Sequence, residues 1–439
     1  MKTSARLLVL VLTLILPSIV FGQVNADTVV TLKQCVEFAL RNQPAVKQAS
    51  IDQEINERDI RIGLSGWLPQ LSSSDEYLHY FKGSPVTGAN SSGSHPNADE
   101  FSSLGLQASQ VIYNNDVLQA AKAARYSRQY YKQNTLSSQI NVVSDVSKAF
   151  FDVLLSQKQL EILNEDIARL QRSLKDAYNR YQAGVTDKTD YKQATISLNN
   201  SIASRKQTVE SVNSKLAYLK QIMGIGASHN IILSYDSTRY EQETNIDTNQ
   251  KLDVNNRIEY RLLQSQKGLA NVNVNYYRYG FLPSISAVGS YNLISLNDKF
   301  SNLYSQSFPS AYAGITLSLP IFQGTKRLQN LSKARLQTDR IDLDIINSEN
   351  TINTEYVQSL ASYKSNYTSW VMLKQNVGLA KDVYKVISLQ YREGIKTYLD
   401  VIVAQSDLRT AELNYYNALF QLLSSKIDLE RSLGILTVQ

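Results

Sequence analysis

One ten-residue stretch occurs twice in this chain: Tyr181-Gln-Ala-Gly-Val-Thr-Asp-Lys-Thr-Asp190 and, about 210 residues later, Tyr391-Arg-Glu-Gly-Ile-Lys-Thr-Tyr-Leu-Asp400. Tyrosine, glycine and aspartate occupy the same places in both copies. Further upstream, Gly66-Trp-Leu-Pro69 is matched by Gly280-Phe-Leu-Pro283. This period is far longer than that of solenoid repeats, so the pattern indicates a duplicated half-molecule.

The start of the chain has the composition of a secretory signal. Two basic residues precede the apolar run Leu7–Leu16, and small residues follow it. The run is too short for a comfortable membrane-spanning helix. We therefore expect residues 1–22 to be a signal peptide, with cleavage after Gly22 or Ala26.

The mature chain is expected to contain two structural repeats, residues 23–224 and 251–439. Residues 225–250 between them show no clean hydrophobic period and are expected to be a linker. Each repeat reads as helix, strand, polar loop, strand, very long helix, turn and helix. In the first repeat, the opening helix is expected over Leu32–Ile62.

Composition and motifs argue against several classes of function. The formal charge of +6 falls to +4 (6 − 2) without the signal, and basic and acidic residues interleave, so no nucleic-acid partner is expected. The lone cysteine, Cys35, is expected to be a small apolar residue on a helix face. His79, His95 and His229 have no metal-ligand spacing, and no catalytic motif occurs. We expect no cofactor, no metal and no enzymatic activity.

Two strands are expected in each half, and three of the four alternate apolar and polar residues. The pattern is clearest over Ala311–Ile321, and it recurs over Phe101–Tyr113 and Phe281–Leu293. Ten-residue strands joined by long polar loops are typical of outer-membrane barrel hairpins. A half-buried soluble sheet alternates in the same way, so both interpretations stay open at this point. In the barrel interpretation, Gly83–Glu100 and Ser295–Ser310 are cell-surface loops.

Long helices are expected after the second strand of each half. Apolar residues recur with heptad spacing from Val142 to Tyr181, and again from Ile352 to Tyr391. Such a sustained heptad predicts left-handed coiled-coil packing, with the helix after each turn as the neighbour. Neither proline nor glycine lies between Asn114 and Tyr181, so an unbroken helix there would span roughly 100 Å.

The strand count constrains the assembly. Four strands per chain leave two free edges, and lipid does not tolerate an open sheet edge. Two chains would form an eight-stranded barrel filled by side chains, whereas three chains would form twelve strands around a lumen. Long helices without catalytic chemistry favour the lumen and therefore a homotrimer.

These features together resemble the TolC-like outer-membrane efflux channels, which are the outer-membrane factors of tripartite efflux and type I secretion systems. The resemblance extends from Ala39-Leu-Arg-Asn-Gln-Pro44 to Gly434 and rests on the element order, the duplication and the two Tyr-x-x-Gly turns. It implies an α+β membrane protein that is a homotrimer. Its twelve-stranded β-barrel, four strands per chain, would sit in outer-membrane lipid and continue into a twelve-helix periplasmic coiled-coil α-barrel.

The resemblance also implies passive export. Substrates would arrive from an inner-membrane pump through a periplasmic adaptor protein, and the tunnel would open when its tip helices untwist. Small molecules such as drugs and toxic compounds are the expected cargo, and secretion of polypeptides through the same kind of duct stays open. A secreted, elongated coiled-coil scaffold is a rival of a different class, against which the duplicated hairpins argue.

The resemblance assigns gating to four positions of this chain. Thr189 and Asp190 match residues that bond to a neighbouring helix pair, and Tyr391 and Lys396 match their partners. The best-studied members have arginine where Lys396 stands. Lysine keeps the charge but lacks the bidentate fork, so a weaker link is expected.

Constriction and docking positions follow in the same way. Asp400 matches the acidic lining of the narrowest constriction, and Val403 stands where many members place a second aspartate. One acidic ring per trimer is therefore expected. The tip turns that dock the adaptor correspond to the pairs Gly184-Val185 and Gly394-Ile395.

Simpler roles for these residues stay open. Asp190 and Asp400 stand where helices begin and are candidates for N-caps. Tyr391 lies on the heptad seam, so packing alone can explain it. Gly184 and Gly394 suit the left-handed position that ends a helix.

Overall fold

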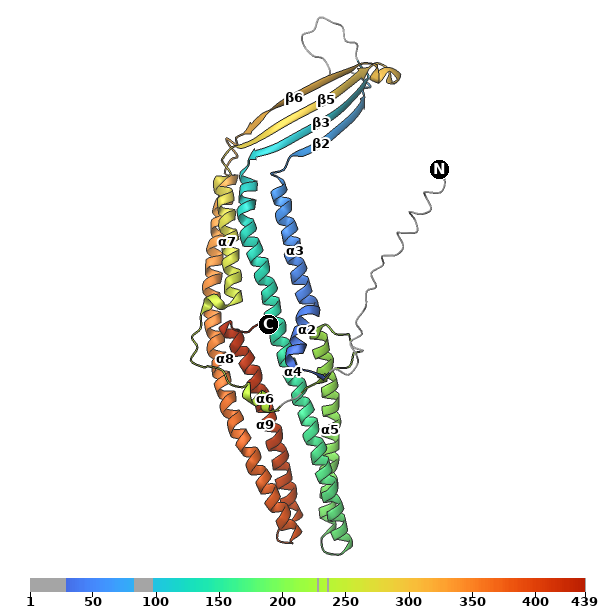
Figure 1. Cartoon of the computed structure of the whole chain (residues 1–439), viewed down its shortest axis with the longest axis vertical. Coiled ribbons are helices and arrows are strands. Elements are labelled where there is room, and N and C mark those ends of the chain that lie inside the picture. The colour runs from blue at the N-terminus through green and yellow to red at the C-terminus, as the bar shows by residue number, and fades with distance from the viewer. Residues whose placement is uncertain (1–28, 83–97, 227–228, 235–236, 439) are drawn as a thin grey trace, which may run out of the picture.

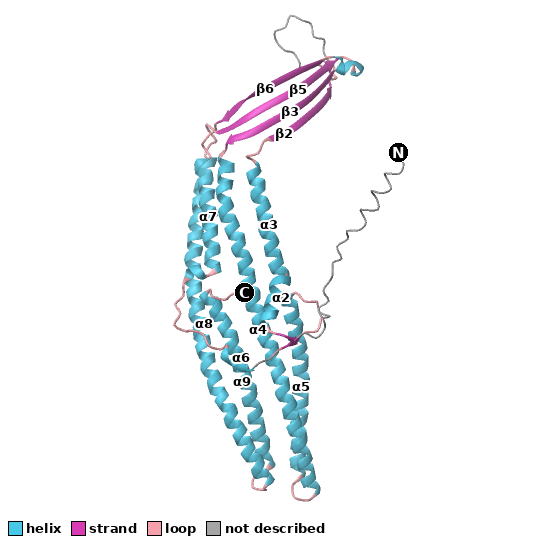
Figure 2. Cartoon of the chain, in the orientation of Figure 1, coloured by secondary structure: helices cyan, strands magenta, loops and turns pink. Residues whose placement is uncertain are grey.

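The protein is an elongated molecule with a four-stranded sheet at one end and long helices below it (Figures 1 and 2). The structure is a computed structural model that describes residues 29–82, 98–226, 229–234 and 237–438. The expected signal peptide with its cleavage sites, and nearly all of the expected loop Gly83–Glu100, lie outside these residues.

Two unbroken helices run the length of the helical part, as the heptads predict. They are α4 (Asn115–Gln182), with 68 residues, and α8 (Lys326–Arg392), with 67. α4 packs along α5 (Lys188–Met223), and α8 packs along α9 (Tyr398–Leu433). All the heptad positions of α4 and α8 are buried or half-buried, so the predicted pairing is confirmed. None of the described helices has a stretch long and apolar enough to cross a membrane.

The upper halves of the long helices have different partners. α3 (Pro44–Ser65) packs beside α4, and α7 (Ile258–Tyr279) packs beside both α4 and α8. The C-terminal end of α5 abuts the backbone at Asn42, and that of α9 abuts Asn256, the last residue of η1 (Val254–Asn256). Each short upper helix therefore continues a lower one almost end to end (Figure 1).

The opening helix differs from the expectation of one continuous helix over Leu32–Ile62. The structure contains α2 (Leu32–Asn42) and then α3, separated by Gln43 in an extended conformation with φ −64° and ψ 124°. The ring of Pro44 disfavours helical backbone in the residue before it, and proline is well placed as the first residue of a new helix. The sequence contained this signal, and the prediction of one helix was wrong.

The sheet is antiparallel, with β2 (Gln70–His79) and β6 (Ser307–Ser318) at its edges. Its central strands are β3 (Glu100–Tyr113) and β5 (Ser284–Asn297), one from each half of the chain. η2 (Phe300–Ser305) lies between β5 and β6. The expected loop Ser295–Ser310 is therefore shorter than predicted, because both strands extend into it.

The predicted alternation separates the two faces of the sheet. The register aligns Leu106, Tyr291 and Ala311 in one row, and the next row, on the other face, contains Gln107 and Ser290. The apolar parities of β3, β5 and β6 thus lie on one face. Within the described part of the chain, η2 contacts the sheet at the end away from the long helices, and no α-helix covers either face (Figure 2). Most of the apolar face is consequently uncovered, and the sheet has two free edges.

Strand β6 ends at Ser318, three residues before the predicted end at Ile321. Pro320 has no backbone N–H to donate to a ladder, so the strand ends before it. The side chains of Ile321 and Phe322 beyond it are almost fully exposed.

A belt of short elements surrounds the middle of the helices. β1 (Val29–Val30) pairs in parallel with β4 (Ile232–Leu233), and α6 (Ser237–Gln242) follows. Seam tyrosines of α8 fasten this belt: the Tyr363 hydroxyl donates to the Thr244 carbonyl at 2.8 Å and the Tyr356 hydroxyl to the Gln250 carbonyl at 3.0 Å. Their rings stay in the seam while their hydroxyls bond the belt, which uses both the apolar ring and the polar tip of tyrosine.

The main hydrophobic core lies at the same height as the belt. Phe150 and Leu154 of α4 meet Leu419 and Leu422 of α9, and all four are almost fully buried. Cys35 is part of this core, as expected for a small apolar residue, and burial raises the pKa of its thiol to about 12.

The helix junctions lead to a stability prediction. Gly224 has φ +72°, and an added Cβ would lie 2.7 Å from the Asn42 carbonyl oxygen, whereas Gly184 has φ +70° and nothing within 4 Å. Gly184→Ala should cost only the left-handed strain of about 1–2 kcal/mol. Gly224→Ala should cost more, since it also separates α5 from the start of α3. Thermal unfolding of the two variants measures the difference, and equal Tm values would contradict the end-to-end junction.

Candidate functional site

The two repeated stretches form matching turns at the end of the molecule opposite the sheet (Figure 1). Gly184 has φ +70° and Gly394 has φ +79°, so both glycines occupy the left-handed position. The following N–H group donates to the helix end in each case, from Val185 to the Arg180 carbonyl at 3.0 Å and from Ile395 to the Gln390 carbonyl at 2.8 Å. The side chains of Val185 and Ile395 are exposed.

The aspartates of the two turns take different local roles. Helix α5 is capped by Asp187, so the alternative of Asp190 as the N-cap is wrong. Helix α9 begins with a capping box, in which the Asp400 carboxylate accepts from the backbone N–H of Thr397 at 2.9 Å and from its hydroxyl at 2.8 Å. These hydrogen bonds lower the pKa of Asp400. Its side chain is thereby fixed at the start of α9.

A small cluster joins all four helices just inside the turns. Its buried members are Ala177 of α4, Ala194 of α5, Tyr391 of α8, and Tyr398 and Val401 of α9. The rings of Tyr391 and Tyr398 have centroids 5.8 Å apart. This tip cluster therefore holds the two hairpins of one chain together.

Arg180 of α4 connects the first hairpin to the end of α8. Its guanidinium carbon lies 4.5 Å from the centre of the Tyr391 ring, and its Nη2 donates to the Arg392 carbonyl at 3.3 Å. A cation over an aromatic ring contributes about 0.5–1 kcal/mol at exposed sites. Sequence analysis missed Arg180, because its partner Tyr391 lies in the other copy of the repeat, and Tyr398, because it is not one of the residues that match between the two copies.

The tip cluster contains unpaired polar groups. In the described part of the chain, the buried hydroxyls of Tyr391 and Tyr398 have no hydrogen-bond partner. Burial raises the pKa of both tyrosines, and the nearby charge of Asp190 adds to the rise. Burial, and then the charge of Asp187, raises the pKa of Asp190. The charge of Asp190 thus acts on both tyrosines, but among the described residues no hydrogen bond joins its carboxylate to either hydroxyl.

The other predicted tip residues are more exposed. Among the described residues, Asp190 and Lys396 form no ion pair, and the side chains of Thr189 and Lys396 point to solvent. Val403 is exposed one turn after the half-buried Asp400. Residues three apart on a helix share a face, so Asp400 and Val403 lie along one side of α9.

Comparison with known proteins identifies the family. The family model described as outer membrane efflux protein matches residues 36–225 and 262–435, which is most of the chain. The chain belongs to the outer membrane efflux protein family. It is accordingly an outer-membrane transport protein, and the family resemblance inferred from the repeated turns is confirmed.

Several relatives of this efflux protein align over nearly its whole length. The outer membrane protein TolC of Vibrio cholerae serotype O1 is 21% identical over 416 residues, covering 93% of this chain and 91% of the relative. The probable efflux pump outer membrane protein TtgC of Pseudomonas putida is 21% identical, covering 92% and 82%. These alignments include both halves of the chain.

Solved structures show the same fold. The outer membrane protein VceC of Vibrio cholerae has a TM-score of 0.74 at 15% identity, covering 92% of this chain and 96% of that one. The CmeC outer membrane channel of Campylobacter jejuni has a TM-score of 0.75 at 18% identity, covering 92% and 85%. The arrangement of sheet, long helices and belt is therefore that of known outer-membrane channels.

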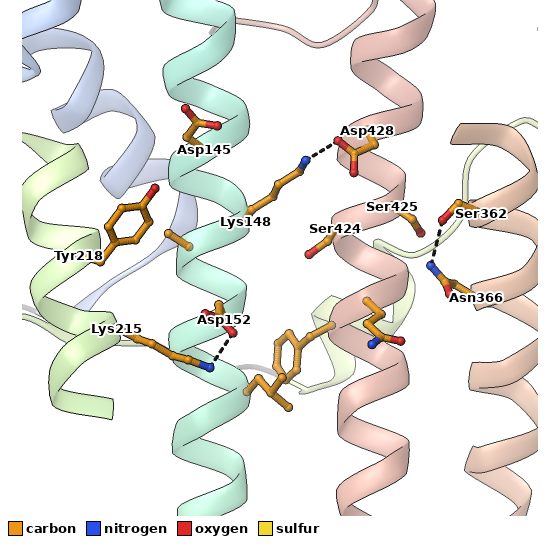
Figure 3. A pocket seen from close by; sticks show the side chains of 14 residues that line it. Asp145, Lys148, Asp152, Lys215, Tyr218, Ser362, Asn366, Ser424, Ser425 and Asp428 are labelled. Atoms are coloured by element: carbon orange, nitrogen blue, oxygen red, sulfur yellow. Dashed lines mark hydrogen bonds and ion pairs between the residues drawn. The ribbon is translucent and has the colours of Figure 1, made fainter. Parts of the chain in front are cut away.

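The efflux protein also has a polar concave surface at mid-height, between its two hairpins (Figure 3). Lys148 of α4 pairs with Asp428 of α9, and Lys215 of α5 pairs with Asp152 of α4 at 2.7 Å. The described residues contain no group of three or more His, Cys, Asp or Glu side chains arranged for a metal ion. The concave surface therefore carries two ion pairs, which link α4 to α9 and α5 to α4.

The buried tyrosine hydroxyls at the tip predict that two substitutions of Tyr398 differ in their effect on stability. Tyr398→Phe removes a buried hydroxyl that has no partner among the described residues, so stability should stay equal or rise by about 1 kcal/mol. Tyr398→Ala, the matched control, should cost about 3–5 kcal/mol because it empties the cluster. Thermal unfolding distinguishes the two. A clear loss in Tyr398→Phe would mean that another chain supplies a partner for this hydroxyl.

Proposed function

We propose that this efflux protein is the exit duct of a tripartite pump, a homotrimer that passively conducts small molecules across the outer membrane. The observation that carries the proposal is the uncovered, open-edged sheet that continues into helices of roughly 100 Å. A structure of this length bridges compartments. The alternative of a secreted coiled-coil scaffold leaves both the apolar face and the sheet edges unexplained.

The sheet supports a shared barrel. Strands β2 and β6 each have one unpaired side, and lipid does not tolerate unpaired backbone groups. Closure between three copies pairs every edge and gives twelve strands, enough for a lumen. The apolar face of β3, β5 and β6 then faces lipid and the polar face lines the channel.

Matching element lengths support internal duplication. The pairs α3 and α7 contain 22 residues each, α5 and α9 contain 36 each, and α4 and α8 contain 68 and 67. We propose residues 23–224 and 251–439 as the two repeats, joined by the linker 225–250. Three chains would thus contribute six similar hairpins to one helical barrel.

The tip turns are the proposed docking and gating region. Exposed Val185 and Ile395 beside Gly184 and Gly394 would meet the periplasmic adaptor, which connects the duct to an inner-membrane pump. The names of several relatives refer to efflux of toluene or antibiotics, which favours small-molecule cargo for this chain as well.

The gate is proposed to rest on weak bonds repeated by symmetry. Asp190 lies near the unpaired Tyr391 hydroxyl, and Thr189 and Lys396 are free to reach a neighbouring chain. Asp400 and Val403 would line the constriction from one side of α9. An exposed ion pair contributes only about 0.2–1 kcal/mol, but three copies suffice to bias a two-state closure.

The assembly is tested by mass measurement in detergent. The purified mature protein should behave as a trimer, because four strands per chain close into a lumen only at twelve. Substitutions at the tip should not dissociate the trimer, since the barrel and not the tip holds the chains together. A stable monomer that conducts ions would contradict the shared barrel.

The gate is tested by conductance in planar bilayers. The double variant Tyr391→Phe, Lys396→Ala should raise the mean conductance through about a tenfold shift of the closed–open equilibrium toward the open state, the shift that roughly 1.4 kcal/mol produces. Trimer mass serves as the assembly control. If the double variant assembles and conducts like the parent, these residues do not hold the gate, and seam packing around Tyr391 explains closure better.

A further inference from the structure

A buried carboxylate joins three helices well above the tip. Asp166 of α4 has only 2% of its side chain exposed. It accepts hydrogen bonds from the Ser201 hydroxyl of α5 at 2.8 Å, from Nε2 of Gln405 at 2.9 Å and from Nη1 of Arg409 at 3.2 Å, the last two on α9. Arg409 Nη1 also donates to the Ser201 hydroxyl at 3.0 Å. One side chain therefore links the first hairpin to the second.

A second carboxylate extends this cluster to the fourth helix. Glu412 of α9 is largely buried, and burial raises its pKa. Its Oε1 lies 3.7 Å from Nζ of Lys381 on α8. The cluster of Asp166, Glu412 and their partners thus touches all four helices of the lower half.

Arg169 of α4 lies between the carboxylates of Asp166 and Glu412 and forms a hydrogen bond with neither. Its Nη2 is 4.0 Å from Oδ1 of Asp166 and 3.8 Å from Oε2 of Glu412, and its Nη1 donates to the Glu165 carboxylate at 3.4 Å. Among the described residues, its buried Nε and Nη2 make no hydrogen bond. A buried donor without an acceptor is costly, so a small shift of α4 against α9 would let Arg169 bond Glu412 fully. The cluster therefore offers a second arrangement, in which Arg169 bonds Glu412.

Packing alone does not account for these residues. Buried charge clusters are commonly no more stabilising than apolar side chains of similar size, and here they lie beside the apolar positions of the helix seams. Asp166 lies 11 residues before Ala177 of the tip cluster, about 16 Å along α4. At this distance Asp166 does not contact the tip cluster, but it is close enough to set the geometry of the helices that form the tip.

We propose that Asp166 is a positioning residue for the gate, pinning the α4–α5 hairpin to α9 and serving as the pivot about which the tip turns separate. This inference rests on the proposed function as a gated duct. The movement is a shift of α4 along α9 that brings Arg169 of α4 into hydrogen-bonding distance of Glu412 on α9. Coupling of this kind needs an element with two discrete arrangements, and the second arrangement proposed here is the one in which Arg169 bonds Glu412.

The experiment compares Asp166→Asn with a matched control in the purified trimer. Asp166→Asn keeps the side-chain volume but removes the charge that holds Arg409 and Ser201. The mean conductance should therefore rise through about a tenfold shift of the closed–open equilibrium toward the open state, equivalent to roughly 1.4 kcal/mol. Spin labels at Val185 and Ile395, placed in a Cys35→Ser background, should report a wider distance distribution. Glu57→Gln, which breaks the interhelix pair with Arg128 at 2.7 and 3.0 Å above the belt, should change neither readout.

Further variants separate positioning from general destabilisation. Ser201→Ala removes one hydroxyl and should give a smaller rise in conductance, which keeps the test valid if Asp166→Asn does not assemble. Adding Arg409→Gln to Asp166→Asn should give little further effect, because both act on one bond. Additive effects, or parent-like conductance and tip distances in assembled Asp166→Asn and Ser201→Ala, would overturn the proposal.

The outcomes also separate this inference from the function on which it rests. A parent trimer that does not conduct would reject the duct itself. A conducting parent whose gate opens with the Tyr391→Phe, Lys396→Ala variant but not with Asp166→Asn would reject only the positioning role.

Discussion

The heptad seams of α4 and α8 are the constraint on which the rest of the molecule depends. A helix of 68 residues cannot fold back on itself, and its stability comes from a partner that covers its apolar stripe. The lower seams are covered by α5 and α9, so each long helix becomes half of an antiparallel pair. Because both pairs have the same length, their turns end together at one end of the molecule.

The seam changes partner at the level of the belt, and this change explains the glycines there. The lower helices end at Gly224 and Gly434, both left-handed, with backbone carbonyls less than 3 Å from where a Cβ would lie. Only glycine allows this close approach. The upper helices α3 and α7 start almost where the lower ones stop, so the seams stay covered up to the sheet.

The sequence predicts what depends on local period and fails where distant residues meet. Heptads and alternation gave the long helices and the strand faces, because burial imposes those periods directly. Pro44 and Pro320 were readable signals that the predicted boundaries overlooked. Arg180 and Asp166 were not readable, since their partners Tyr391, Gln405 and Arg409 lie more than 200 residues away. Nothing local marks a polar residue that only folding brings to a partner.

Stability is distributed unevenly along the helices, and this favours movement at the tip. The core at belt height contains large, fully buried side chains such as Phe150, Leu154 and Leu419, each contributing about 1.5–3 kcal/mol. The tip cluster is small, and two of its members bury hydroxyls that find no partner in the part of the chain that the structure describes, which subtracts from its stability. Moving parts are drawn from the least stable region of a structure. A cluster that is weak inside one chain is therefore suited to bonds that a neighbouring chain makes and an adaptor breaks.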